Sequence, residues 1–347
     1  MKIICKNIIK GSYFLITFIL CSCGSGGNDQ IVFNKIVSTQ VHFIEKLTGV
    51  SQPIDMFKKD NSLFISDYRG DSLLCVYSIE GQKIMNWLLP KGLEDNEFQS
   101  PIQVKLLSNG QLFVNNRWHY SAGKYILDPL NKNTELIGEK ITVNTDIDML
   151  YPIAVDFYVA SGRFAQGRYA LLNNCGEIID YFGSYPTYKK GEEKIANTPK
   201  FMFHQTIFSQ NPEDNNLLAS LSSHTLDIFD ISDINNPKEI SHTLFSKYDY
   251  FYQHGADWAS VTAKDDVEAG AISISVSGNY IYILYSPSIL TGKNKVYKMN
   301  EVWVFSWDGT PIKKYLLDTY IGTIYIDNDI VYCTTLDSPP ALTYFKI

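Results

Sequence analysis

Short runs of alternating apolar and polar residues follow one another along the chain, and Gly, Asn, Asp or Pro bounds each run. Examples are Ser62-Leu-Phe-Ile-Ser-Asp67, Gln111-Leu-Phe-Val-Asn115 and Asn279-Tyr-Ile-Tyr-Ile-Leu284. Alternation with a period of two is typical of strands that bury one face, and the 3.6-residue period of amphipathic helices is almost absent. The pattern predicts an all-β protein built from antiparallel strands and tight turns.

The runs recur about every fifty residues. Pro53-Ile-Asp-Met, Pro101-Ile-Gln-Val and Pro152-Ile-Ala-Val begin three similar units. A period near fifty residues with four strands in each unit is typical of a β-propeller. The chain has room for six units, which we expect to begin near residues 51, 101, 152, 200, 271 and 320. Two packed β-sandwiches are the alternative, but they do not require this repetition.

A strand-like segment, Ile31–Phe43, precedes the first unit, and the last unit ends at Ile347. We expect this early segment to pair with the final blade and to close the ring, because closure removes the open sheet edges on which other chains could pair. The predicted fold is therefore a six-bladed β-propeller of four-stranded antiparallel blades, closed by an N-terminal strand.

The first thirty residues have another pattern. Lys2, Lys6 and Lys10 precede the apolar run Tyr13–Leu20, which is too short to span a bilayer. Leu20-Cys21-Ser22-Cys23 and a Gly/Ser/Asn run follow, and together they resemble a bacterial lipobox. Cys23 fits the lipidated position better than Cys21, because the residue before it is small.

This leader predicts three parts: a lipoprotein signal peptide at 1–22, a flexible tether at 23–30 and the propeller at 31–347. An ordinary secretory signal is the alternative. Gly24 is not the aspartate associated with inner-membrane retention. We therefore expect an acylated Cys23 in the lipid of the outer membrane of the cell envelope, with periplasmic and surface orientation both open.

Composition narrows the class of protein. Hydrophobic residues make up 45% and charged residues 19% of the chain, which excludes a disordered protein. The net charge is −7 without a basic block, so nucleic acid is not an expected partner. Cys75, Cys175 and Cys333 follow the leader without a CxxC pair, so no zinc cluster is predicted. Cys75 and Cys333 lie in apolar runs and are expected in the core.

Several stretches resemble a known family. Phe64-Ile-Ser-Asp67-Tyr-Arg-Gly70 and the residues that follow to Gly81 resemble an NHL-type or TolB-type blade. Lys91-Gly-Leu-Glu-Asp-Asn-Glu97-Phe98-Gln-Ser-Pro101 resembles the connector between such blades, and Tyr280–Ser286 and Val302–Asp318 match later blades. The chain is thus similar to TolB-like six-bladed propeller lipoproteins of Bacteroidetes, a resemblance that implies fold and location and very little about activity. The third unit, Arg163-Phe-Ala-Gln-Gly-Arg168-Tyr-Ala-Leu-Leu172, departs from it, because it lacks the Leu-Phe-Ile/Val core of the first two units.

Motifs of catalysis and cofactor binding do not stand out. The sequence holds no G-x-S-x-G, HExxH, GxGxxG or P-loop, and its six histidines include no HxH or HxxxH pair. Asp227 and Asp230-Ile-Ser-Asp233 lack the glycine and terminal Glu of a calcium-binding loop, so we interpret these aspartates as turn formers. No catalytic residue, metal ligand or cofactor is predicted.

The order of strands within a blade places the connections on two faces. The B–C and D–A connections share one face, and the long segments Pro90–Ser100, Asn133–Tyr151, Gly183–Pro199, Ser241–Gly270 and Ser286–Asn300 fall in this class. Long loops on a rigid scaffold are common binding surfaces. Aromatic, Arg and His side chains there could stack on a flat ligand or sugar ring. The candidate ligand-binding residues are Arg69, Arg117, Trp118, His119, Tyr252, His254 and Trp258.

Alternatives remain open for these residues. The aromatics between Tyr248 and Trp258 would equally serve to pack their insertion against the propeller. Arg163 and Arg168 either join the site or are surface charges. For the whole protein, the sequence favours a non-catalytic recognition module for a glycan, a peptide or a partner protein. A propeller hydrolase or lyase, with acid, base or metal ligands converging at the central channel, is the alternative, and a structural or assembly role is the third.

Overall fold

The structure is a computed structural model in which residues Ile31–Ile347 form one compact unit. Within this unit it describes all residues except 95, 108, 129–132, 188–190, 247, 255–258, 265–266 and 290–297. The side chains of residues 127, 128, 133, 134, 254 and 259 also lie outside the description. The predicted signal peptide, the tether and Cys23 fall in residues 1–30, outside the described residues.

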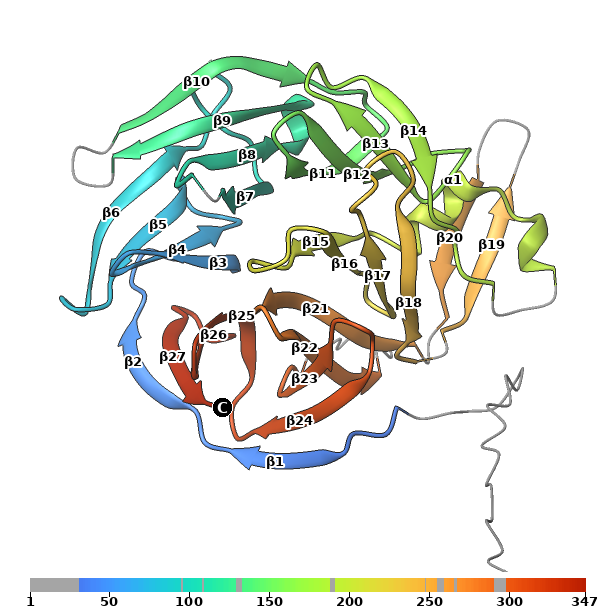
Figure 1. Ribbon diagram of the computed structural model, residues 1–347. Helices are drawn as coiled ribbons and strands as arrows, with labels where there is room; N and C mark the ends of the chain where they lie inside the picture. Colours follow the sequence, from blue (N-terminus) through green and yellow to red (C-terminus); the bar gives the residue numbers. More distant parts are fainter. Residues whose placement is uncertain are drawn as a thin grey trace, which may run out of the picture. The chain divides into compact units, whose positions relative to one another are not determined.

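Six four-stranded antiparallel units, the blades, make up the ring in Figure 1. Blade 1 consists of β3 (Pro53–Lys59), β4 (Ser62–Asp67), β5 (Ser72–Ser78) and β6 (Lys83–Pro90). Blade 2 consists of β7 (Ile102–Leu106), β8 (Leu112–Asn116), β9 (Ser121–Asp128) and β10 (Asn133–Thr142). Blade 3 consists of β11 (Ile147–Ala154), β12 (Phe157–Gly162), β13 (Tyr169–Asn173) and β14 (Ile178–Phe182). Blade 4 consists of β15 (Ile207–Gln210), β16 (Leu217–Leu221), β17 (Thr225–Asp230) and β18 (Lys238–Leu244). Blade 5 consists of β21 (Glu268–Val276), β22 (Tyr280–Ile289), β23 (Glu301–Ser306) and β24 (Pro311–Leu317). The C-terminal strands of blade 6 are β25 (Ile321–Asp327), β26 (Ile330–Thr335) and β27 (Ala341–Lys346).

The first strand of each blade lies at the centre of the ring, and the following strands step outward (Figure 1). Neighbouring inner strands touch: β25 contacts both β3 and β21, and β15 contacts β21. The six blades begin at residues 53, 102, 147, 207, 268 and 321, which are within three residues of the predicted positions except for blades 3 and 4, where the differences are five and seven residues. The prediction of an all-β, six-bladed propeller is confirmed.

Two N-terminal strands close the ring. β2 (His42–Lys46) pairs antiparallel with β27, so that Lys46 lies opposite Ala341, and it becomes the outermost strand of blade 6. β1 (Lys35–Thr39) instead pairs parallel with β24 and adds a fifth strand to blade 5. Closure by an N-terminal strand is confirmed, but the closing strand begins near the end of the predicted segment Ile31–Phe43.

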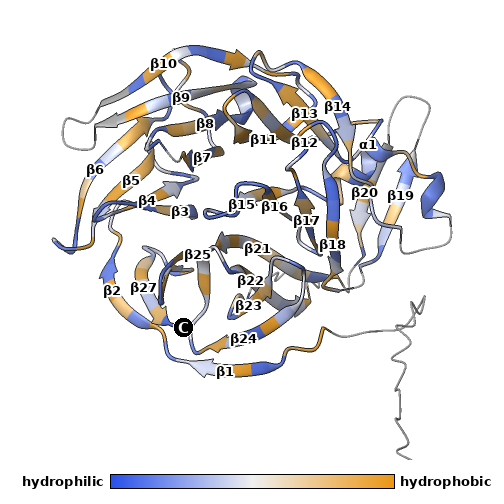
Figure 2. Ribbon diagram, viewed as in Figure 1, coloured by the Kyte–Doolittle hydropathy of each residue, from blue (hydrophilic) through white to orange (hydrophobic). Residues whose placement is uncertain are grey.

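The core lies between the blades. Strands show orange apolar positions alternating with blue polar ones in Figure 2, and the buried apolar side chains gather in clusters shared by adjacent blades. Leu74 of blade 1 packs in the same cluster as Val114 of blade 2, for example. Cys75 and Cys333 are fully buried in such clusters, as predicted, and Cys175 is exposed. Each blade therefore buries its apolar faces against its neighbours.

Two connections carry structure of their own. The connection from blade 3 to blade 4 contains η2 (Glu192–Lys194), α1 (Asn197–Lys200) and η3 (Phe201–Phe203). The connection from blade 4 to blade 5 contains the hairpin of β19 (Tyr250–His254) and β20 (Ala259–Ala263). Both belong to the D–A class, so they lie on the face made by the B–C and D–A connections, which we call the loop-rich face. The A–B and C–D connections form the opposite, short-loop face.

Two details of the predicted topology are wrong. Most of Asn133–Tyr151 is strand, in β10 and β11, rather than a long loop. In blade 3 the second strand is Phe157–Gly162, and Arg163–Arg168 is the connection that follows it. The apparent departure of the third unit therefore arose from comparing a loop with a strand: Phe157-Tyr-Val-Ala supplies the expected apolar core.

Candidate functional site

Exposed apolar side chains mark the loop-rich face. Eight large hydrophobic residues that are exposed lie in or beside its B–C and D–A connections: Tyr68, Leu93, Trp118, Met202, Phe251, Ile289, Tyr320 and Leu336. By the same measure, the described residues in or beside the connections of the short-loop face are Val155 and Ile179. Every blade contributes to this set directly or through an adjoining connection. Exposed large hydrophobic side chains are therefore more frequent on the loop-rich face than on the short-loop face.

Trp118 lies on a short turn that the fold holds in place. The 3₁₀ turn η1 (Arg117–His119) connects β8 to β9, and Tyr120 ends it in the left-handed conformation, with φ of 47°. The Arg117 guanidinium forms an ion pair with Asp148 of blade 3. Trp118 itself is 60% exposed, and His119 is half-buried. The turn therefore presents a large ring to solvent from a fixed backbone.

Arg69 lies on the equivalent connection of blade 1. Asp67, at the end of β4, is buried and accepts hydrogen bonds from the backbone N–H groups of Ser51, Gln52 and Arg69. The Asp67 carboxylate thus fixes this connection, and the Arg69 side chain remains exposed. Arg69 and Arg117 with Trp118 are placed on the same face in adjacent blades.

The candidates from the insertion are placed less uniformly. Tyr248 and Tyr250 are buried and pack with Val267, while Tyr252 is half-buried against the same cluster. Phe203 of η3 stacks on Tyr248 with ring centroids 5.9 Å apart. These aromatics therefore pack the hairpin against the other insertion, and Tyr248 also stacks on His224 of the propeller, so they have the packing role that was the alternative to ligand binding. The His254 side chain and Trp258 lie outside the described residues.

A buried ionic cluster joins blades 3 and 4 beneath the loop-rich face. Arg168, only 1% exposed, pairs with Asp227 of β17 at 2.7 Å and donates a hydrogen bond to the Thr225 hydroxyl at 3.1 Å. Tyr169 donates to Asp227, and its hydroxyl also lies 2.5 Å from that of Ser220. Of the two alternatives for Arg168, a surface charge is excluded by its burial, and the interpretation of Asp227 as a turn former is wrong. Asp230, by contrast, accepts a hydrogen bond from the Ser232 N–H and does form a turn.

Histidines surround this cluster. His242 of β18 bonds through Nδ1 to the Asp227 carboxylate at 2.5 Å. Burial would raise the pKa of Asp227, but Arg168 and His242 hold it below its usual value. Burial lowers the pKa of His224 to about 4, and burial together with Arg168 lowers the pKa of His204 well below 6.5. His204 bonds through Nε2 to the Tyr248 hydroxyl at 2.7 Å, and His224 stacks on the same ring. The two neutral rings thus support the insertion.

The Asp55 carboxyl group, on an inner strand of the ring, is a weaker acid than an ordinary aspartate. Asp55 lies on the inner strand β3, and burial raises its pKa to about 6, although a backbone hydrogen bond and Lys105 act in the opposite direction.

Among the residues that the structure describes, no three His, Cys, Asp or Glu side chains come together as a metal-binding group. No helix in the same part of the chain is long and apolar enough to cross a membrane.

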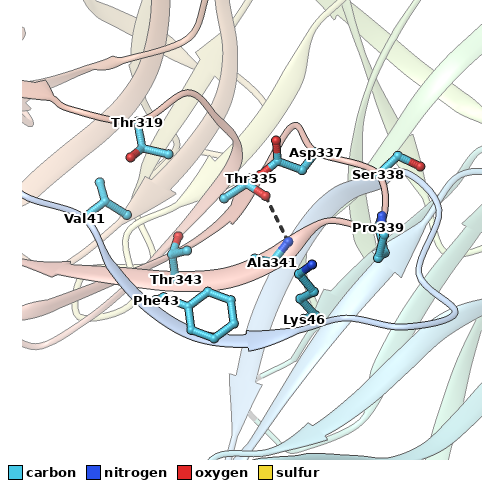
Figure 3. Close-up of a pocket in the computed structure, with 10 residues that line it drawn as sticks. All are labelled: Val41, Phe43, Lys46, Thr319, Thr335, Asp337, Ser338, Pro339, Ala341 and Thr343. Atoms are coloured by element: carbon cyan, nitrogen blue, oxygen red, sulfur yellow. Dashed lines mark hydrogen bonds between the residues drawn. The ribbon is translucent and has the colours of Figure 1, made fainter.

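A pocket that the sequence did not reveal lies where the two ends of the propeller meet. Its volume is about 340 Å³, and β2, β27, Thr319 and the loop 336–340 enclose it (Figure 3). The loop connects β26 to β27 and Thr319 lies between blades 5 and 6, so these parts of the lining belong to the loop-rich face. No local signal could have found it, because its residues are separated by almost the whole sequence.

Comparisons with known proteins agree with this architecture. A member of the DUF4221 family from Bacteroides vulgatus superposes with a TM-score of 0.57 at 11% identity, over 91% of this chain and 98% of that chain. A virginiamycin B lyase from Staphylococcus aureus superposes with a TM-score of 0.50 at 12% identity, over 89% and 100%. Raptor from Chaetomium thermophilum gives 0.50 at 10% identity, over 89% of this chain and 29% of that one.

These likenesses show the fold alone, because proteins with such different names share it. The sequence matches none of the curated proteins with which it was compared. Residues 32–329 match the family described as TolB-like 6-blade propeller-like. The match spans most of the six blades, and the chain therefore belongs to the TolB-like six-bladed propeller family.

Proposed function

We propose that this protein is a recognition module that binds its ligand, a glycan, a peptide or a partner protein, through the loop-rich face. The single observation that carries this proposal is the gathering of exposed hydrophobic side chains on that face. Apolar surface is costly to leave in water, so its concentration on one side of a rigid scaffold favours a binding surface. The short-loop face, where Val155 and Ile179 are the corresponding described residues, provides the internal comparison.

The Trp118 turn is the strongest anchor on this face. A tryptophan held on a fixed turn loses little conformational freedom on binding, and its ring can bury a large area. Arg117, fastened to Asp148, adds a cation beside it. Residues of this kind are frequent binding hot spots, and truncating one commonly weakens binding by roughly 2 kcal/mol or more.

A binding array tests the proposal. Labelled protein is applied to arrays of glycans and peptides as wild type, as a triple variant of the loop-rich face (Tyr68→Ser, Trp118→Ser, Tyr320→Ser) and as Val155→Ser. All four positions are exposed, so each variant should keep its fold. We expect array features bound by wild type to be lost in the triple variant and kept in Val155→Ser. Equal binding by all three proteins would contradict the use of this face.

We also propose that the protein is anchored to the outer membrane by an acylated Cys23. The support is the basic, apolar leader that ends in Leu20-Cys21-Ser22-Cys23. Cys23→Ala should release the protein from the membrane fraction or leave an unprocessed precursor, and Cys21→Ala serves as the matched control. A Cys23→Ala protein that remains processed and membrane-bound would overturn the assignment.

A further inference from the structure

We propose that the pocket at the closure of the ring binds one sugar ring of a carbohydrate. The inference rests on the proposed recognition function and names a ligand class and a subsite for it. Part of the pocket lining belongs to the loop-rich face, and the pocket measures about 340 Å³, within the range of small-ligand sites. It is assembled from both ends of the propeller: Phe43 and Lys46 belong to β2, and Thr343 belongs to β27.

Two opposite charges line this pocket without neutralising each other. The Lys46 ammonium and the Asp337 carboxylate are both exposed, and no ion pair or hydrogen bond joins either side chain to another described residue. Figure 3 shows Lys46 projecting from β2 and Asp337 from the loop between β26 and β27. Asp337 would repel a purely anionic ligand, and Lys46 would repel a purely cationic ligand. Neutral hydroxyl groups suit both, because each hydroxyl can donate to the carboxylate and accept from the ammonium.

Fixed hydroxyls form the floor of the pocket. Thr335 is buried and accepts a hydrogen bond from the Ala341 N–H at 2.9 Å, which leaves its own proton available. Thr343 donates to the Cys333 carbonyl at 3.3 Å, so its oxygen can still accept. The two hydroxyls therefore offer one donor and one acceptor at positions set by backbone contacts. This arrangement complements a ligand dense in hydroxyl groups.

Phe43 supplies an apolar wall. Its ring is 62% exposed although it lies on a strand, and Figure 3 shows it beside Thr343 at the edge of the pocket. The C–H face of a sugar ring can cover such a phenyl group while its hydroxyls meet the polar side chains. An exposed aromatic ring, an unneutralised carboxylate and fixed hydroxyls in one small cavity together point to a carbohydrate.

Binding at this place should also strengthen the closure. A ligand that touches β2 and β27 binds only the closed ring, so it stabilises the folded protein by mass action. At a sugar concentration about ten times the dissociation constant, we expect the thermal midpoint to rise by roughly 2 °C or more. The shift offers a readout that needs no knowledge of the natural ligand.

The experiment uses the chain after the leader and a panel of neutral hexoses and N-acetylhexosamines, with free amino acids and dipeptides as the competing class. Thermal midpoints and ligand-detected NMR are recorded for wild type, Asp337→Asn, Phe43→Ala and the control Asp329→Asn. Asp329 is an exposed carboxylate of the same blade on the short-loop face. We expect at least one sugar to bind wild type and Asp329→Asn, and its affinity to fall about tenfold or more in Asp337→Asn and Phe43→Ala.

The other outcomes are distinct. Binding of an amino acid or dipeptide in place of sugars, lost in Asp337→Asn, would overturn the carbohydrate assignment. Sugar binding that survives both pocket variants but is lost in Trp118→Ser would overturn this pocket and leave the recognition function standing. Absence of any binding by the panel would also overturn the pocket proposal, and the array experiment would then decide the recognition function separately.

Discussion

The ring is joined differently at two interfaces between its parts, which we call seams: the interface between blades 3 and 4, and the closure between β2 and β27. Between blades 3 and 4, the side chains of Arg168, Tyr169 and Asp227 form a buried ionic network. At the closure, β2 joins β27 through backbone pairing, with Leu47 and Leu342 buried beneath it. Removing one partner of a buried ion pair is costly, whereas the intact pair adds little net stability. The first seam therefore depends on each charge being matched, and the second depends on a whole strand being present.

Deleting the closing strand should have the largest effect. Removal of residues 31–46 exposes the edge of β27 and takes away its ladder hydrogen bonds, each worth about 1 kcal/mol. We expect aggregation or loss of most of the stability, measured by thermal unfolding and gel filtration. Deletion of residues 31–40 removes β1 and leaves β2, so it should cost less. Equal midpoints for the longer deletion and the intact chain would refute closure by β2.

Breaking the ion pair comes next. Asp227→Ala leaves Arg168 buried opposite an apolar side chain, and we expect a loss of about 3–5 kcal/mol in chemical denaturation. The double variant Arg168→Met/Asp227→Leu removes both charges and should recover a large part of this loss. If the double variant is no more stable than Asp227→Ala, the cost lies in the packing of the seam and not in the unmatched charge.

Acid should weaken the blade 3–4 seam before the closure. The unfolded chain protonates His224 near pH 6.5, whereas burial lowers its pKa in the folded protein to about 4. The contribution of the neutral ring is complete above pH 6.5 and is lost as the pH falls toward 4, by roughly 3 kcal/mol. His204 acts in the same direction. Thermal midpoints measured across this range should fall, and the slope should be shallower in His224→Gln; a flat wild-type profile would contradict the assignment.

A residue outside both seams should have the smallest effect. Trp118→Ala removes a side chain that is 60% exposed, and we expect a change in unfolding free energy within about 0.5 kcal/mol. Trp303 is only 6% exposed, so Trp303→Ala is the matched control and should cost about 3–5 kcal/mol. A large destabilisation by Trp118→Ala would remove this residue from the ligand-binding candidates, because it would show that the ring packs in the fold.

Much of the fold was predictable because its signals are local. The alternation in Ser62–Asp67 reports which side chains a strand buries, and the spacing of similar runs reports the repeat. The same strand order placed Arg69 and Trp118 on one face. The alignment of the units was wrong in blade 3, where the connection Arg163–Arg168 was matched with a strand of the other units. The units share few identical residues, so their sequences alone do not determine how they should be aligned.

The sequence by itself determined the class of fold, the number of blades and the face on which the long connections lie, because hydrophobic period and turn residues act over a few positions. Only the tertiary structure decided which side chains meet. Arg168 and Asp227 are far apart in the chain, and Phe43 and Asp337 come from opposite ends of the propeller. The sequence around a charge or an aromatic ring does not identify its partner, so the ion pair and the pocket could be found only in the folded structure.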